Sequence, residues 1–412
     1  MEARRQLGQP PVVIVTGANG GVGFGICQRL LLQLHQPNAP DGFPQEIASN
    51  IQSNEKPIVG YQGVTLVMAC RNMKRAEAAR TKLLRWLDTQ LAELQKSPIS
   101  DKDYVRKFRA NVKVHIHELD LASVSSVLKF GATVRKEFNY VSHLVCNAGV
   151  ASFKGIDWIA CFKQLATNPL AAITAPTFYT QHVGEISADN LGWVWQSNVF
   201  GHFVLFRELE TLLYQTPYAS SRVIWCSSLE ASPKFYDSKD WQLKTTEHSY
   251  ESTKYQIDLI ACHLDQIAVQ TVPTGEKKVR HLITEPGVCS TTISAAIAGP
   301  ILDKIKVLLF YIGRMFGSPH HTIDPFKAAI AAVHLILVPL TFLPLFLGTN
   351  PVRFGAQTGR WGDERVGVTL VKEWDAHKEE GAFLVAQCDA LYETFKKAEA
   401  APNHFETASE RM

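Results

Sequence analysis

Short apolar runs alternate with longer amphipathic stretches along most of this chain. Strand-like runs lie at residues 12–16, 64–69, 112–119, 143–146, 222–226 and 280–284. Helix-like stretches between them include residues 73–94 and 191–213. Runs of β-branched and other apolar residues without polar alternation are typical of parallel strands buried on both faces. The pattern therefore predicts an α/β fold, a Rossmann-type doubly wound parallel sheet with helices on both sides.

Two stretches interrupt this alternation. Residues 33–63 contain several prolines, asparagines and glycines, and we expect a loop inserted between the first helix and the second strand. Residues 151–190, rich in Ala, Thr and Pro, are expected to form a second insertion with short helices. The main domain is thus expected to span residues 10–300.

A third feature is the almost wholly apolar segment 328–348, which is long enough to span a bilayer. It contains Pro339 and Pro344, which would break a regular helix. A hairpin or interfacial anchor, a spanning helix and a buried core helix all remain open. Because lysines and arginines flank this region, we favour a membrane-associating segment over residues 301–350. Residues 351–412 are expected to form a polar extension with an amphipathic helix at 374–397.

Composition narrows the functional classes. The chain has 412 residues, of which 46% are hydrophobic and 20% charged, as in an ordinary globular protein. A net charge of +3, without a basic run interleaved with aromatics, gives no reason to expect a nucleic-acid partner. The eight cysteines include no C-x-x-C pair, so we expect no bound metal and a reducing compartment. Because the first strand begins at about Val12, we expect no signal peptide before it.

A glycine-rich turn follows the first strand and precedes a helix-like stretch. Glycine allows the backbone to approach a pyrophosphate closely, and a helix N-terminus offers it free N–H groups. The strand–glycine–helix context favours a nucleotide site over an ordinary turn. The residues expected to bind the cofactor here are Thr16, Gly17, Asn19, Gly21, Val22 and Gly23.

The end of the second strand discriminates between cofactors. NAD-selective sites place an Asp or Glu there for the ribose 2′-hydroxyl, whereas an arginine accommodates a 2′-phosphate. Here the strand is followed by Arg71 and Asn72, with no carboxylate. Although Arg71 could be a simple surface cation, we predict NADPH/NADP+ as the cofactor.

Three later strand ends add candidate contacts. Asp120 is suited to accept a hydrogen bond from an adenine amino group, or to cap the helix that follows. Asn147, before Ala148 and Gly149, can connect neighbouring strands or simply mark a turn. The turn formed by Pro286 and Gly287 could flank a nicotinamide, and Thr291 could bind its amide or a phosphate; an ordinary Pro-Gly turn is the alternative.

A tyrosine and a lysine four residues apart, Tyr250 and Lys254, would share one helix face. An ammonium group in that position lowers the pKa of a phenol and suits it for proton transfer. The hydroxyl of Ser228, after the strand at 222–226, could bind the same substrate oxygen. Alone, the spacing also fits an ordinary helix face. Asn198 is a polar residue in an apolar helix, where a satisfied core amide or a kink is the alternative.

Taken in order, these motifs resemble the short-chain dehydrogenase/reductase superfamily over residues 10–295. The resemblance implies a seven-stranded sheet and the catalytic tetrad Asn198, Ser228, Tyr250 and Lys254. In that tetrad the tyrosine protonates the substrate oxygen, the serine binds it, the lysine also holds the nicotinamide ribose, and the asparagine supports a water-linked proton path. One departure is the separation of 22 positions between Ser228 and Tyr250, longer than is usual for the superfamily, which we expect to enlarge the loop beside the substrate.

The insertion at 33–63, the long loop and the apolar C-terminal segment look like the fungal 3-keto-steroid reductases of ergosterol biosynthesis. This resemblance implies reduction of a 3-keto sterol to the 3β-hydroxy sterol during C4 demethylation. The implied partners are the sterol ketone, a membrane or lipid-droplet surface, and other enzymes of the C4-demethylation complex. The implied location is the endoplasmic reticulum membrane or a lipid droplet, with the catalytic domain facing the cytosol. Another lipid-ketone or retinoid reductase, and a non-enzymatic dinucleotide-binding scaffold, remain as alternatives.

Overall fold

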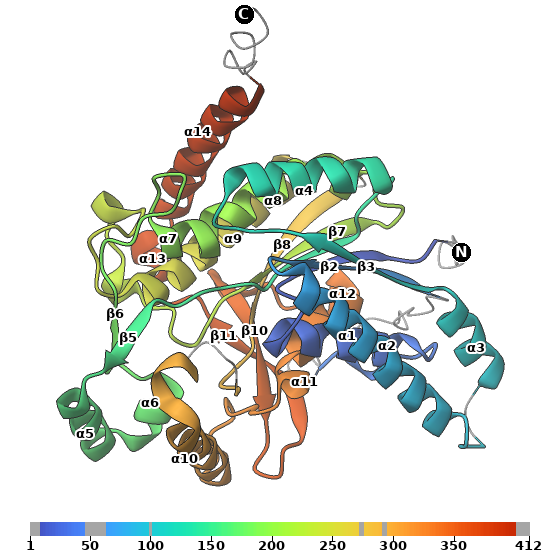
Figure 1. Cartoon of the computed structure of the whole chain (residues 1–412), viewed down its shortest axis with the longest axis horizontal. Helices are drawn as coiled ribbons and strands as arrows, with labels where there is room; N and C mark the ends of the chain where they lie inside the picture. Colours follow the sequence, from blue (N-terminus) through green and yellow to red (C-terminus); the bar gives the residue numbers. More distant parts are fainter. Residues whose placement is uncertain (1–8, 46–62, 99–100, 272–275, 291–294, 401–412) are drawn as a thin grey trace, which may run out of the picture.

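A mostly parallel sheet forms the centre of the molecule (Figure 1). The computed structural model describes residues 9–45, 63–98, 101–271, 276–290 and 295–400. Within these ranges the sheet has nine strands, and seven run parallel in the order β3, β2, β1, β4, β7, β8, β10. Their bounds are β1 (Val12–Thr16), β2 (Val64–Cys70), β3 (Val112–Glu118), β4 (His143–Cys146), β7 (Ser220–Cys226), β8 (Lys278–Glu285) and β10 (Asn350–Thr358). The first six confirm the strands predicted from the apolar runs.

The seventh parallel strand comes from far along the chain. β10 pairs with β8 in parallel through Phe354 and Thr284, and it forms an antiparallel hairpin with β11 (Glu364–Leu370). A two-residue strand, β9 (Phe346–Leu347), pairs with the start of β10. Residues 351–370, which the sequence pattern assigned to the polar extension, therefore contribute the seventh parallel strand and the antiparallel β11 to a nine-stranded sheet, where the resemblance implied seven strands.

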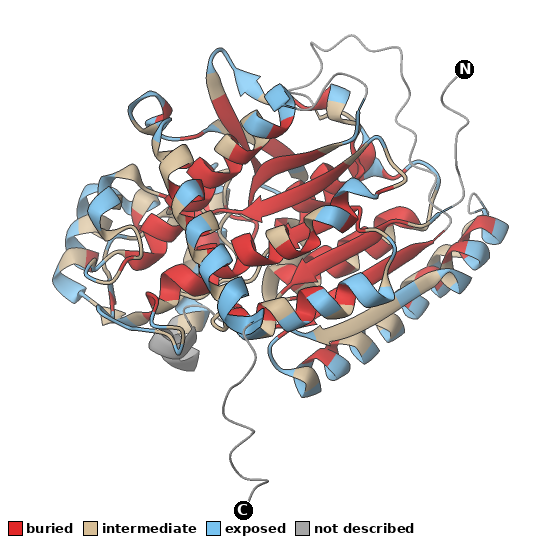
Figure 2. Cartoon of the chain, turned by 90° about the horizontal axis from the view of Figure 1, so that it is seen from above, coloured by how far each residue is buried: buried red, intermediate tan, exposed pale blue. Residues whose placement is uncertain are grey.

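Helices cover both faces of the sheet, as predicted. One face carries α4 (Val124–Glu137), α8 (Gly201–Tyr214), α9 (Ser249–Thr271) and, outside them, α14 (Glu380–Ala400). The other carries α1 (Gly21–Leu34), α2 (Met73–Leu94) and α12 (Ile330–Leu337). Alternate β1 side chains enter different cores: Val12 and Ile14 pack with the first group, Val13 and Val15 with the second. Figure 2 shows the buried strands between helices whose outer faces are exposed.

The apolar segment 328–348 contains a core helix. All eight residues of α12 are buried, and the helix packs against α1, β8 and β10. Its one polar side chain, His334, contacts the Asp41 carbonyl oxygen at 2.7 Å through Nδ1. No helix among the described residues is long and apolar enough to cross a membrane. Residues 330–337 thus form the buried core helix, one of the three alternatives, and association of the wider segment 301–350 with a membrane stays a prediction.

The two insertions differ in content. Of residues 33–63, the described part holds the end of α1 and a short 3₁₀ turn at Pro40–Gly42, and residues 46–62 lie outside the described ranges. Residues 151–190 form β5 (Phe153–Ile156), α5 (Trp158–Thr167), α6 (Pro169–Thr174) and β6 (Tyr179–Gln181). The short helices confirm the prediction, while the two-stranded sheet of β5 and β6 was not expected. A further helix, α10 (Ala295–Met315), packs against α6 and β5 beside this insertion (Figure 1).

The predicted amphipathic helix at 374–397 is present as two consecutive helices. The short α13 (Trp374–His377) precedes the long α14. The buried side chains of α14, among them Leu384 and Cys388, face the core that α9 also lines. The C-terminal part of the chain is thus built into the main domain.

Candidate active site

A cavity of about 610 Å³ opens at the carboxyl ends of the parallel strands. Parallel α/β sheets place their ligand sites at this edge. Its lining unites most of the residues that the sequence singled out: Thr16, Gly17, Asn19, Gly21, Val22, Arg71, Asp120, Asn147, Ser228, Tyr250, Lys254, Pro286 and Gly287. Gly23 and Asn198 lie behind the wall, and Thr291 lies outside the described residues.

The glycine turn forms one side of the cavity. Gly17 has a φ of +67°, and its N–H group donates to the Ala69 carbonyl oxygen at 2.8 Å, which bends the chain sharply after β1. A Cβ on Gly23 would lie 2.5 Å from the Asn147 side-chain nitrogen. Gly23 is therefore required for the packing of α1 against the Asn147 side chain.

Asn147 connects the ends of two neighbouring strands. Its side-chain amide donates to the Thr16 carbonyl oxygen at 2.9 Å, and the Thr16 hydroxyl accepts from the N–H groups of Asn147 and Ala148, each at 2.9 Å. This confirms the predicted connecting role. His202 was not predicted to take part: its Nε2 lies 2.9 Å from the Thr16 hydroxyl, and burial lowers the pKa of its imidazole to about 4.

The ends of β2 and β3 meet at another part of the cavity. Arg71 is exposed there, and Arg75, from the first turn of α2, lines the same wall. Asn72 caps α2 by accepting from the Arg75 N–H group at 2.9 Å. The Asp120 carboxylate accepts from the Ala122 N–H group at 3.0 Å, while Ser123 is the N-cap of α4. Asp120 thus shapes its turn and still reaches the cavity.

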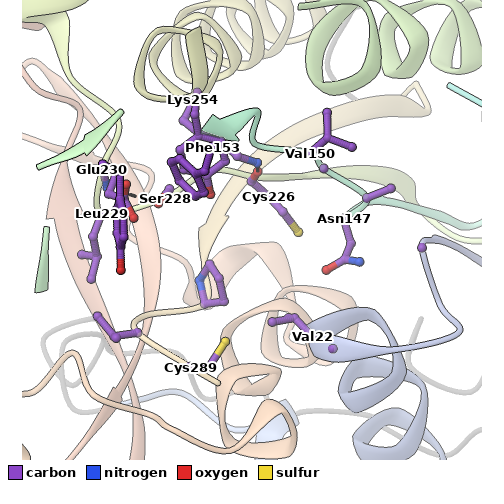
Figure 3. A pocket seen from close by; sticks show the side chains of 18 of the residues that line it. Val22, Asn147, Val150, Phe153, Cys226, Ser228, Leu229, Glu230, Lys254 and Cys289 are labelled. Atoms are coloured by element: carbon purple, nitrogen blue, oxygen red, sulfur yellow. Dashed lines mark hydrogen bonds between the residues drawn. The ribbon is translucent and has the colours of Figure 1, made fainter. Parts of the chain in front are cut away.

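The three reactive side chains meet where β7 ends. Tyr250 and Lys254 lie one turn apart in α9, with the lysine Nζ 5.8 Å from the centroid of the phenol ring. The Ser228 side chain also lines the cavity here and lowers the pKa of the Tyr250 phenol. Lys254 donates to the Cys226 carbonyl oxygen at 2.7 Å. The neighbouring Ser227 hydroxyl instead donates to the Lys254 carbonyl oxygen, which supports Ser228 as the serine that faces the substrate. Figure 3 shows Ser228 and Lys254 around this point.

The electrostatics of Tyr250 differ from the prediction. Burial raises the pKa of its phenol, the Glu230 carboxylate raises it further, and the hydrogen bond from Ser228 acts in the opposite direction. Burial also lowers the pKa of Lys254. The expected lowering of the Tyr250 pKa is therefore not observed here. A raised pKa keeps the phenol protonated at neutral pH, which is the form that can donate a proton.

Asn198 is a fully buried amide in the π-helical segment Gln196–Phe200 that precedes α8. Its side chain donates to the Val150 carbonyl oxygen and accepts from the Val150 N–H group, both at 2.8 Å. A Cβ on Gly149 would lie 3.5 Å from the Asn198 Oδ1 and 3.6 Å from the Lys254 Nζ. The satisfied core amide is thus what forms, behind Gly149 and close to Lys254. A role in proton transfer stays a prediction.

Two acidic side chains near the reactive group were missed. Glu230 lines the cavity beside Ser228 and Leu229 (Figure 3), and burial raises its pKa to about 8. Asp258 lies one turn beyond Lys254 in α9, so its spacing was a usable signal. Burial raises the pKa of Asp258 to about 6.

A buried arginine on β10 supports the serine from behind. The Arg353 guanidinium donates to the Ser228 carbonyl oxygen at 3.1 Å and lies 3.5 Å from Asp258 and 3.4 Å from Glu285. All three charged side chains are at most 3% exposed, so the arginine compensates two buried carboxylates. Because β10 itself was not predicted, Arg353 carried no recognisable signal.

The far end of the cavity is apolar and is built by the second insertion and α10. Its lining side chains include Phe153, Trp158, Leu165, Ile173, Phe178, Ile305, Leu309 and Phe310. From the long loop between Ser228 and Tyr250, only Leu229 and Glu230 reach the cavity. Trp241 of that loop packs edge-on against Trp195, with ring centroids 5.0 Å apart. The long loop therefore borders the cavity only through its first two residues, while residues 151–190 and α10 form the apolar wall.

One group in the described part of the chain has the donors to hold a metal ion. His115 and His117 of β3 and Glu137 of α4 place their ligand atoms within 4.8 Å of one another. None of the three lines the cavity.

Comparisons with known proteins identify relatives over nearly the whole chain. No protein-family model matches the sequence. Among solved structures is the L-sorbose reductase of Gluconobacter frateurii, solved with NADPH and L-sorbose. It is 16% identical to this chain, and the match spans 80% of this chain and 91% of the reductase, with a TM-score of 0.46.

The curated relatives are more similar. The 3-keto-steroid reductase of Debaryomyces hansenii is 29% identical over 322 residues, 78% of this chain and 79% of its own. The 3-keto-steroid reductase of Schizosaccharomyces pombe is 31% identical over 384 residues, 93% of this chain and 97% of its own. At this identity and coverage, the chain belongs to the family of 3-keto-steroid reductases.

Proposed function

We propose that the protein uses NADPH to reduce the C3 ketone of a sterol to the 3β-hydroxyl, at the C4-demethylation stage of ergosterol biosynthesis. The observation that carries this proposal is that Tyr250 and Ser228 line a cavity whose far end is apolar. A sterol ketone has the same distribution of polarity, with one carbonyl at the end of a large apolar body. Membership of the 3-keto-steroid reductase family supports the same substrate.

The residues around the cavity fit a phosphorylated dinucleotide. The turn at Gly17 and the N-terminus of α1 offer backbone N–H groups to a pyrophosphate. Arg71 and Arg75 line the cavity after β2, where an NAD-selective site would carry a carboxylate. Asp120 and Asn147 also line the cavity, after β3 and β4. Pro286 and Gly287 line it after β8. When bound, NADPH supplies the hydride for the carbonyl carbon.

The side chains of this protein account for the remaining chemistry. Tyr250 donates its proton to the carbonyl oxygen, which completes the alcohol. Ser228 holds that oxygen through its hydroxyl and keeps it next to the phenol. The charge of Lys254 stabilises the phenolate that forms once the proton has left. Asn198 fixes the chain at Val150, and so maintains the wall beside Lys254.

We also propose a location and partners. A sterol ketone partitions into lipid, which favours action at the endoplasmic reticulum membrane or a lipid-droplet surface, with the catalytic domain facing the cytosol. Other enzymes of the C4-demethylation complex would supply the ketone and consume the alcohol.

A ketone panel tests the proposal directly. Purified protein is incubated with NADPH and, in parallel, a 4-methyl sterol 3-ketone, a retinal and a long-chain aliphatic ketone, and the products are identified by mass spectrometry. We expect the 3β-hydroxy sterol as the main product. Preferential turnover of another ketone would assign a different lipid reductase. No NADPH oxidation with any ketone would favour a dinucleotide-binding scaffold.

A further inference from the structure

Two helices near the far end of the cavity present apolar side chains to solvent. On α5 these are Trp158, Ile159 and Phe162, and on α10 they are Leu308, Ile312 and Met315, with Phe316 just after the helix. We call these seven residues the outer apolar face. Ile159 is 84% exposed and Phe316 is 83% exposed. Seven large apolar side chains exposed on two neighbouring helices are unusual for a protein that meets only water.

The outer apolar face lies beside the mouth of the cavity. α6 packs against both α5 and α10, so the three helices form one wall, at the lower left of Figure 1. Leu165, Leu309 and Phe310 point into the cavity from this wall. Trp158 and Ile305 line the cavity and are also exposed, so they lie on its rim. The same helices thus carry apolar side chains on the inside and on the outside.

Positive charge accompanies the outer apolar face. Lys304 lies one helical turn before Leu308 on α10, and Lys163 directly follows Phe162 on α5; both are exposed. The carboxylates nearby have local partners: Asp157 accepts from the first N–H groups of α5, and Asp303 lies 2.6 Å from the Lys306 ammonium group. Apolar side chains bordered by lysines are typical of surfaces that bind phospholipid headgroups and the acyl region beneath them.

We propose that the outer apolar face docks on a phospholipid bilayer and places the mouth of the cavity against the acyl chains. A hydrophobic ketone then enters between α5 and α10 without crossing water. The reason for docking rests on the proposed function, but the docking itself needs neither substrate nor cofactor. An experiment can therefore contradict the proposed function without contradicting the docking, and the reverse.

Vesicle flotation of the full chain tests the docking. The vesicles contain phosphatidylcholine, with or without phosphatidylserine. The test variants are Ile159→Glu/Phe162→Glu on α5 and Leu308→Glu/Phe316→Glu on α10. The matched control is Ile267→Glu/Val269→Glu, which also adds two charges at exposed apolar positions, but near the C-terminal end of α9. We expect each test pair to weaken vesicle binding at least about tenfold, or 1.4 kcal/mol, while the control binds as the wild type does.

A kinetic measurement supplies the second readout. With ketone presented in vesicles, the test pairs should raise KM, while KM for a short water-soluble ketone and the thermal midpoint stay at wild-type values. The proposal is overturned if the wild type does not float with vesicles, or if the test pairs float as well as the control. It is equally overturned if the test pairs abolish self-association of the chain and leave flotation unchanged, because a second copy would then be the occupant. Absence of sterol reduction in detergent with intact flotation would contradict only the proposed function.

Discussion

The two ends of the cavity are built on different principles. At the reactive end, Thr16, Asn147 and Ser228 extend from the ends of neighbouring strands, and each is held by hydrogen bonds to buried groups. At the far end, α5 and α10 contribute apolar side chains from helices that stand off the sheet and expose their outer faces.

The difference separates chemistry from substrate choice. Proton transfer requires heavy-atom distances fixed to a few tenths of an ångström, which a sheet whose strand ends are connected by hydrogen bonds can maintain. Recognition of a large apolar body requires shape and area, which helices packed by dispersion forces provide. Variants at the two ends should therefore change different kinetic constants.

The largest effect is expected from Tyr250→Phe. This change removes the donated proton but keeps the ring, so kcat should fall about 100- to 10,000-fold, the range for a general acid. Steady-state NADPH oxidation with the sterol ketone measures it, and NADPH binding by fluorescence should stay unchanged. Turnover close to the wild-type rate in a folded variant would contradict the role of Tyr250.

Arg353→Met tests whether the reactive end depends on buried charge compensation. The change leaves Asp258 and Glu285 buried without their cation. Removing one partner of a buried ion pair costs about 3–5 kcal/mol in the free energy of unfolding. Urea denaturation measures the loss. Arg365→Met, at an exposed position on β11, is the matched control and should lose less than about 1 kcal/mol.

Arg71→Ala tests cofactor choice at the same end. Loss of a charge-assisted hydrogen bond to a 2′-phosphate costs about 1.5–3 kcal/mol, so KM for NADPH should rise roughly 10- to 150-fold while KM for NADH stays the same. Arg80→Ala, further along α2 where the arginine pairs with Glu77, is the control. Equal effects on both cofactors would show that Arg71 does not contact the phosphate.

At the far end, Leu309→Ala removes part of the apolar wall. We expect KM for the sterol ketone to rise about tenfold, since burying one leucine side chain is worth roughly 1.5–3 kcal/mol. KM for a short ketone should not change, and neither should kcat for the sterol ketone or the short ketone. A fall in kcat with the short ketone would mean that the two ends are not separable.

The smallest effect concerns Glu230 and pH. Its pKa is raised to about 8 from 4.5, so between these values the folded protein binds more protons than the unfolded chain. The free energy of unfolding of the wild type should therefore fall as pH rises through this window. The Glu230→Gln variant should lose less stability over the same window. Thermal midpoints of both proteins measured across the window test this, and parallel curves would exclude the shift.

The sequence predicted well which residues meet at the reactive end, because short motifs place them there. Glycine is needed at Gly17 by a positive φ and at Gly23 by packing, and Tyr250 and Lys254 share one helix face through a fixed spacing. Each of these signals is local in the chain.

Other features depended on contacts that no local pattern contains. The apolar run that became α12 looked membrane-associating, because hydropathy does not show that β8 and β10 will cover it. Arg353 meets Ser228 across 125 positions of the sequence, and the far wall combines residues 151–190 with α10. Burial, unlike spacing, also decided the direction of the Tyr250 pKa shift.

The late position of β10 has a consequence for biosynthesis. During translation, Ser228, Tyr250 and Lys254 all leave the ribosome well before the strand that carries Arg353. Until that strand inserts beside β8, Asp258 and Glu285 lack their buried cation, and one edge of the sheet is open to pairing with other chains. A nascent or prematurely terminated chain that stops before residue 350 therefore contains Asn198, Ser228, Tyr250 and Lys254 but lacks the arginine that supports Ser228 from behind.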